Sequence, residues 1–137
     1  FSRLIGLDVY VNGSFLNAYE GDGIIISTPT GSTGYNLSAG GPIVDPMARL
    51  MIITPVCPHS LTSKSIVLPS DAKVSIEIAK KRKTQDTEAI VSFDGGNDFE
   101  LAAGDVLDIC VSQRTTQLVK ASDVNFYEIL RNKLGGK

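Results

Sequence analysis

The chain has little cysteine, little net charge and no long apolar run, and each scarcity argues against a class of function. Its two cysteines, Cys57 and Cys110, are too few for a disulfide framework and lack the spacing of metal ligands. A formal net charge of −2 gives no electrostatic basis for binding nucleic acid or an acidic membrane. No apolar run approaches a membrane span, and no secretion signal opens the chain. We therefore expect a cytoplasmic protein with no metal site of its own.

Length and turn spacing predict one domain that is mainly β. The 137 residues, 42% of them hydrophobic, suffice for a single core. Strand patterns cover residues 7–11, 15–19, 24–26, 50–53, 65–68, 73–79, 89–93, 105–111 and 116–120. The Asn12-Gly13 pair predicts a tight hairpin turn, and Cys110 is expected in the core of its strand. Turn residues at intervals of about ten positions favour a β-sandwich-like fold over a helical or βαβ fold.

Two helices are expected beside the strands. The first runs from about Thr33 to Ala39 and is ended by Gly40-Gly41-Pro42. The second lies near the end of the chain, where Ser122-Asp123 can cap it. Its apolar residues recur at helical spacing; they are Phe126, Tyr127, Ile129, Leu130 and Leu134. The simplest expectation is that this apolar face packs on the sandwich.

The most informative segment is Thr28-Pro29-Thr30-Gly31-Ser32-Thr33-Gly34, between the strand at 24–26 and the first helix. In a strand–turn–helix segment, free backbone N–H groups and hydroxyls converge on a ligand. Helix capping accounts for one hydroxyl but not for four. The glycines match neither the P-loop nor the Gly-x-Gly-x-x-Gly dinucleotide fingerprint. Neutral donors, the ring of Tyr35 and the carboxylate of Asp22 suit a sugar or a base better than a bare phosphate.

Three ordered motifs closely resemble those of NAD kinases, also called inorganic polyphosphate/ATP-NAD kinases. They span Gly21 to Pro42, Thr54 to Leu61 and Val91 to Gly95. Many members carry Ala where this chain has Gly34. These enzymes phosphorylate the adenosine-ribose 2′-hydroxyl of NAD to give NADP. The resemblance therefore implies that the parent protein is a NAD kinase, a transferase of NADP biosynthesis.

The resemblance assigns residues 1–137 to the NAD-binding C-terminal domain of such an enzyme. The family's N-terminal α/β domain carries a Gly-Gly-Asp-Gly motif, whose Asp is the catalytic base, and an Asn-Glu or Asn-Asp pair. This sequence has neither, since Gly40-Gly41 precedes Pro42 and Gly95-Gly96 precedes Asn97. The resemblance thus implies no catalytic residue in this chain, and an isolated domain that is inactive.

The resemblance also implies the ligands and partners. The phosphoryl donor would be ATP or polyphosphate with Mg²⁺ or another divalent cation, and NAD would be the substrate. The protein would form a homodimer or homotetramer, with no nucleic-acid or membrane partner. The C-terminal helix would return to the N-terminal domain instead of packing on the sandwich.

By the same resemblance, eleven residues bind NAD: Asp22, Thr30, Thr33, Gly34, Tyr35, Asn36, Leu37, Ser38, Cys57, Gly96 and Arg3. Asp22 matches the family carboxylate that contacts NAD, and Cys57 matches a position near a neighbouring subunit's ligand. Gly96 follows an Asp-Gly turn and stands where many relatives have Gln. The single histidine, His59, is expected to be structural and hydrogen-bonded across the sandwich.

Two alternatives stay open. The chain could be a stand-alone nucleotide-binding or regulatory module, or a related lipid kinase domain of the diacylglycerol or sphingosine type. The Thr-Pro-Thr-Gly-Ser-Thr run followed by Ser-Ala-Gly-Gly favours the NAD enzyme over the lipid kinases. A Gly-Gly-Asp-Gly motif upstream in the gene would decide between the enzyme and the module.

Overall fold

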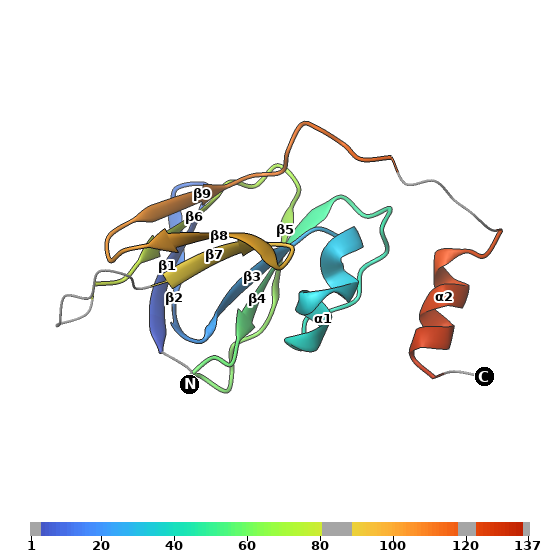
Figure 1. The fold of residues 1–137 in the computed structure, drawn as a ribbon, viewed down its shortest axis with the longest axis horizontal. Coiled ribbons are helices and arrows are strands. Elements are labelled where there is room, and N and C mark those ends of the chain that lie inside the picture. The colour runs from blue at the N-terminus through green and yellow to red at the C-terminus, as the bar shows by residue number, and fades with distance from the viewer. Residues whose placement is uncertain (1–3, 81–88, 118–122, 136–137) are drawn as a thin grey trace.

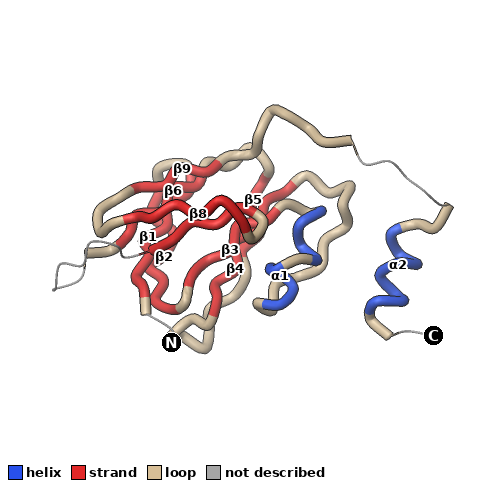
Figure 2. Tube along the Cα trace, viewed as in Figure 1, coloured by secondary structure: helices blue, strands red, loops and turns tan. Residues whose placement is uncertain are grey.

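The computed structural model describes residues 4–80, 89–117 and 123–135. The strands are β1 (Ile5–Val11), β2 (Ser14–Gly21), β3 (Gly23–Ser27), β4 (Leu50–Val56), β5 (Ile66–Pro69), β6 (Val74–Ile78), β7 (Ala89–Phe93), β8 (Gly96–Leu101) and β9 (Val106–Ile109). The helices are a 3₁₀ turn, η1 (Thr30–Thr33), a short α1 (Tyr35–Ser38) and α2 (Phe126–Lys133). The domain is mainly β, as predicted (Figure 2).

The strands form three antiparallel sheets. A four-stranded sheet has the order β2-β1-β6-β9, a three-stranded sheet has the order β3-β4-β5, and β7 and β8 pair as a hairpin. The two larger sheets contribute side chains to one core, which includes Val9 and Val74 from the first and Met51 and Ile53 from the second. The expected β-sandwich-like packing is confirmed (Figure 1).

The turn between β1 and β2 forms as the sequence predicts. Asn12 has φ 51° and Gly13 has φ 82°, which are the positive values that a two-residue hairpin turn requires. The side-chain Oδ1 of Asn12 accepts a hydrogen bond from the backbone N–H of Lys73 at 2.9 Å. The turn therefore also anchors the start of β6.

Three strand predictions need correction. Strand β8 is not among the predicted strands, because Gly96 and Asn97 resemble turn residues and Asn97 adopts φ 51° inside an irregular pairing. Strand β9 ends at Ile109, so Cys110 lies beyond the edge strand and is exposed, not buried in the core. Of the strand predicted over 116–120, residues 116–117 are not in a strand and residues 118–120 lie outside the described residues.

The first helix is shorter than predicted. Instead of one helix over 33–39, the chain makes η1 and α1, each of four residues. Gly34 separates them with φ −86° and ψ −133°, values that no helix continues through.

The C-terminal helix forms but does not pack on the sandwich. Its cap is Asn125 in place of Ser122-Asp123: the Asn125 side chain accepts from the backbone N–H of Glu128 at 2.9 Å. No residue of α2 is buried, and Figure 1 shows the helix apart from the sheets. The prediction of packing on the sandwich is wrong, because the two larger sheets already cover each other's apolar faces. Within the described ranges, none of the helices has the length and apolar character needed to span a bilayer.

Candidate functional site

The hydroxyl-rich loop, which we define as residues 28–38, leaves the end of β3 and folds back over the three-stranded sheet. Strand β3 pairs with β4 so that Ser27 lies opposite Ile52 and Ile25 opposite Thr54. The side chain of Asn36, in α1, reaches Thr54 in the middle of β4. The loop therefore has an inner side against the sheet and an outer side toward solvent (Figure 1).

The inner side consists of Ser32 and Asn36, which are 0% and 1% exposed. The amide nitrogen of Asn36 donates to the backbone oxygens of Ser32 at 3.2 Å and Pro42 at 3.1 Å. Its Oδ1 accepts from the hydroxyl of Thr54 at 2.5 Å. The Oγ of Ser32 accepts from the backbone N–H of Val44 at 3.1 Å. These bonds fix both the loop and the segment that returns from it to β4.

Gly41 is required by the same packing. A Cβ at this position would lie 2.4 Å from Oδ1 and 2.6 Å from Cγ of Asn36. The Asn36 side chain is itself held by its hydrogen bonds, so it has no room to yield. The Gly40-Gly41 pair thus ends the helix and also admits the Asn36 amide.

Two of the four hydroxyls between Thr28 and Thr33 have internal roles. Thr28 Oγ1 accepts from the backbone N–H of Gly31 at 3.0 Å, which stabilises the turn into η1. Ser32 holds the return segment. A local turn bond therefore accounts for one of these hydroxyls, and a bond to a distant segment accounts for a second.

The outer side consists of Thr30, Thr33, Tyr35 and Ser38. The hydroxyls of Thr30 and Thr33 make no hydrogen bond to any residue that the structure describes, and the Tyr35 side chain is 68% exposed. Leu37 is also exposed. These groups leave two hydroxyls and an aromatic face available to a ligand.

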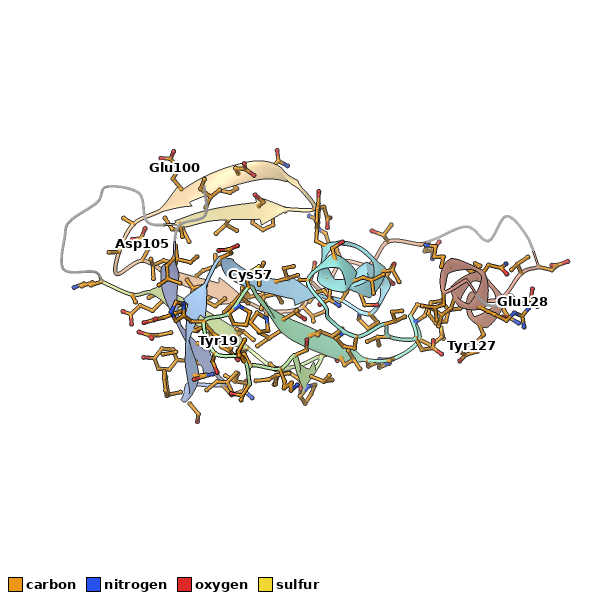
Figure 3. The ribbon with its side chains drawn as sticks, turned by 90° about the horizontal axis from the view of Figure 1, so that it is seen from below. Tyr19, Cys57, Glu100, Asp105, Tyr127 and Glu128 are labelled. Carbon is orange, nitrogen blue, oxygen red and sulfur yellow. The ribbon has the colours of Figure 1, made fainter. Side chains whose placement is uncertain are left out.

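The turn between β7 and β8 lies against Tyr35. A Cβ on Gly95, whose φ is +77°, would come within 2.8 Å of the Tyr35 hydroxyl. Gly96 follows directly at the start of β8, and Asp94 in the same turn is exposed. Two motifs about sixty residues apart in the sequence therefore meet at the outer side of the loop. Figures 1 and 3 both show the end of this hairpin next to α1.

Asp22 and Cys57 lie together at a different place. The backbone N–H of Asp22 donates to Val56 O at 3.0 Å, and a Cβ on Gly21 would meet Cys57 O at 2.7 Å. Both side chains are exposed. They lie at the start of β3, whereas Thr30 follows its end, so the predicted residues form two groups. Arg3 lies outside the described residues.

A shallow cavity of about 530 Å³ lies beside the Asp22–Cys57 corner and is not lined by the hydroxyl-rich loop. Its lining includes Glu20, His59 and Lys64. His59 is exposed, and its backbone N–H donates to Glu20 O at 2.7 Å. His59 is thus hydrogen-bonded to β2 of the other sheet as expected, although the bond comes from its backbone N–H and not from its imidazole.

One contact connects α2 to the segment that follows the loop. The Tyr127 hydroxyl donates to the Asp45 carboxylate (Tyr127 is labelled in Figure 3). This bond, together with one from the backbone N–H of Met47, lowers the pKa of Asp45 below its ordinary 3.8. The hydrogen bond to the Asp45 carboxylate, with its negative charge, raises the pKa of Tyr127 above 10.0.

The described part of the chain does not fit a metal ion. Nowhere in it do three or more His, Cys, Asp or Glu side chains gather as ligands would.

Thr54 and Ser65 have no predicted role, although the hydroxyl of Ser65 lies 2.9 Å from that of Thr54. The available signal was a threonine inside the otherwise apolar strand β4.

Comparison with known proteins gives one consistent result. The family model for the ATP-NAD kinase C-terminal domain matches residues 1–121. The NAD kinase of Lachnoclostridium phytofermentans is 51% identical over 137 residues, which is 100% of this chain and 48% of that protein. The NAD kinase of Agathobacter rectalis is 51% identical over 133 residues, 97% of this chain and 47% of that protein. The chain spans about half the length of the curated relatives it matches.

Two solved structures share the fold. Yeast NADH kinase complexed with NADH superposes with a TM-score of 0.69 at 36% identity, over 78% of this chain and 30% of that one. A NAD kinase from Archaeoglobus fulgidus in complex with ATP superposes with a TM-score of 0.71 at 30% identity, over 81% of this chain and 41% of that one.

Proposed function

This chain belongs to the ATP-NAD kinase C-terminal domain family, and from that premise we propose that it is the dinucleotide-binding domain of a NAD kinase. The enzyme would transfer a phosphoryl group to the adenosine-ribose 2′-hydroxyl of NAD and release NADP. The observation that carries the proposal is the outer side of the hydroxyl-rich loop, where Thr30 and Thr33 have free hydroxyls beside the exposed ring of Tyr35. The ATP bound by the Archaeoglobus fulgidus relative favours ATP as the donor, with polyphosphate as the alternative.

The residues of the outer side divide the recognition of NAD between them. The Tyr35 ring offers a face on which a base can stack, and the hydroxyls of Thr30 and Thr33 can donate to or accept from a ribose or an amide. Gly34, Leu37 and Ser38 complete the surface, while Gly96 lies at the turn that faces Tyr35. Asn36 contributes from the inner side by holding α1 in place. Orientation of the 2′-hydroxyl is what such a site supplies to phosphoryl transfer.

Asp22 and Cys57 would act on a ligand bound by a neighbouring subunit. They lie at the start of β3, and the hydroxyl-rich loop begins at its end. An assembly of two or four chains that brings this corner to the loop of a neighbour would join the two groups in one NAD site. Arg3 belongs to the proposed site by resemblance alone.

The other groups that phosphoryl transfer needs belong, in this proposal, to an N-terminal domain. The 137 residues contain no Gly-Gly-Asp-Gly, and the described ones offer no metal cluster, so the catalytic base and the ligands of the divalent cation are assigned elsewhere. The apolar residues of α2, with Ile129 and Leu134 exposed, would pack against that domain. The cytoplasmic location expected from the sequence stays a prediction.

The test is NADP formation by the whole protein that carries this chain, supplied with NAD and either Mg-ATP or polyphosphate. We expect NADP, and we expect Asp22→Ala to weaken NAD binding about tenfold, equivalent to about 1.4 kcal/mol. The matched control is Asp71→Ala, which removes an exposed turn carboxylate far along the chain from the site. No NADP with either donor would contradict the proposal. NAD binding without NADP formation would instead identify a regulatory nucleotide-binding module. The relatives named NAD kinase argue against the lipid kinase alternative.

A further inference from the structure

A chain of buried and partly buried hydrogen bonds connects the hydroxyl-rich loop to β4 and to the segment that precedes β5. Thr54 is 2% exposed, and its hydroxyl lies 2.5 Å from Asn36 Oδ1 and 2.9 Å from Ser65 Oγ. Asn36 in turn bonds to the backbone oxygens of Ser32 and Pro42. No buried side-chain nitrogen or oxygen in the described residues lacks a hydrogen-bond partner.

The direction of every bond in this chain can be assigned. Asn36 faces two backbone carbonyls with one end of its amide, so that end must be the NH₂ group and the other end must be the oxygen. The only hydroxyl proton of Thr54 therefore goes to Asn36, and Ser65 must donate its own proton to Thr54. The hydrogen-bond chain runs from Ser65 through Thr54 to Asn36: Ser65 donates to Thr54, and Thr54 donates to Asn36.

We propose that Thr54 is a positioning residue for NAD binding, acting through Asn36 on the outer side of the loop. This inference rests on the proposed function. Asn36 lies in α1 between Tyr35 and Leu37, and α1 has only four residues, so its placement depends on side-chain anchors more than on its own backbone bonds. The Thr54 hydroxyl, on β4, fixes the Asn36 amide by donating a hydrogen bond to its Oδ1. The amide thereby sets where the Tyr35 ring and the Thr33 hydroxyl meet a ligand.

A threonine that merely fills the core would behave differently. Valine has nearly the same shape, so Thr54→Val keeps the side-chain volume and removes the donor to Asn36 Oδ1 together with the acceptor of the Ser65 hydroxyl. Thr54→Ser keeps the donor and loses one methyl group. The adjacent Ile53, 0% exposed, belongs to the hydrophobic core and gives a control, Ile53→Val, that loosens β4 without touching the hydrogen-bond chain.

The experiment measures steady-state kinetics of the whole protein with NAD and ATP varied in turn. For Thr54→Val we expect the KM for NAD to rise about tenfold, the loss expected from a displaced ring and hydroxyl, while the KM for ATP stays within about twofold. We expect Thr54→Ser and Ile53→Val to keep the KM for NAD within about twofold of the unaltered protein.

Three outcomes would overturn the inference. The first is a folded Thr54→Val protein whose KM for NAD is unchanged, and the second is an equal rise in Ile53→Val. If Thr54→Val does not fold, Thr54→Ala takes its place, since it also removes the donor to Asn36 Oδ1. An unchanged KM for NAD in a folded Thr54→Ala protein is the third. Absence of NADP formation by the unaltered protein contradicts the proposed function itself and removes the basis of this inference.

Discussion

The inner and outer sides of the hydroxyl-rich loop both carry Ser or Thr hydroxyls but differ in burial and hydrogen bonding. On the inner side, Ser32 and Asn36 are buried, and their side chains bond to backbone groups or to Thr54. On the outer side, Thr30 and Thr33 have no partner among the described residues, and Tyr35 is exposed. The comparison indicates that the inner side maintains the shape of the loop and that the outer side is available for recognition. Changes to the inner side should therefore lower stability, and should lower affinity only by displacing the outer side, whereas changes to the outer side should lower affinity at nearly unchanged stability.

The largest effect is expected from Asn36→Ala. The substitution leaves the backbone oxygens of Ser32 and Pro42 and the hydroxyl of Thr54 without their buried partner, at a cost of about 3 kcal/mol in the free energy of unfolding. Urea denaturation measures this cost. The exposed Asn17 is the control, and Asn17→Ala should change stability by less than about 0.5 kcal/mol. Equal effects of the two substitutions would mean that the inner side does not hold the loop.

Gly41→Ala should have the second largest effect on the free energy of unfolding. Its Cβ would lie 2.4 Å from Asn36 Oδ1, and we expect a loss of about 1–3 kcal/mol from this overpacking. Gly23→Ala is the matched control, because no atom lies within 4 Å of a Cβ at that position. Thermal or urea unfolding of the two variants tests the contrast, and a Gly41→Ala protein as stable as Gly23→Ala would show that Asn36 can move.

Tyr35→Ala tests the outer side. We expect NAD affinity to fall about tenfold, or about 1.4 kcal/mol, because the stacking face is lost. The free energy of unfolding should change by less than about 0.5 kcal/mol, since the side chain is exposed. Calorimetric titration measures the affinity, and Tyr35→Phe, which keeps the ring, should bind within about threefold of the unaltered protein. A Tyr35→Phe protein as weak as Tyr35→Ala would assign the role to the hydroxyl.

The smallest effect is the pH dependence of the contact between α2 and the segment after the loop. The pKa of Asp45 is lowered from 3.8, so its contribution is present above that value and is lost as the pH falls through the folded pKa. The pKa of Tyr127 is raised from 10.0, so its contribution is present below that value and is lost as the pH rises through the folded pKa. The protection factors of the α2 amides, in which the intrinsic pH dependence of exchange is divided out, should therefore be highest between these limits. Tyr127→Phe should remove this dependence, and its persistence in that variant would assign it to other groups.

Local sequence chemistry predicted much of the fold, and tertiary packing explains what it missed. The Asn12-Gly13 turn was predictable because a two-residue hairpin depends on the φ values of those two residues alone. Strand β8 was missed because its irregular start resembles a turn, and the exposure of Cys110 depends on β9 lying at a sheet edge. In the loop, the sequence shows how many hydroxyls are present but not which of them are buried and bonded and which are available to a ligand. Ser32 and its neighbour Thr33 differ in role because the loop folds back on β4, and no local pattern encodes that contact.

The central claim is that the two sides of the loop have separate roles, and one pair of variants tests it most directly. NAD is titrated into the unaltered protein, into the double variant Thr30→Val/Thr33→Val and into Ser32→Ala, and urea unfolding is measured for all three. The account predicts that the double variant binds NAD at least about tenfold more weakly at nearly unchanged stability. It predicts that Ser32→Ala loses about 1 kcal/mol of stability, because the backbone N–H of Val44 loses its partner. A folded double variant that binds NAD as tightly as the unaltered protein would contradict the account.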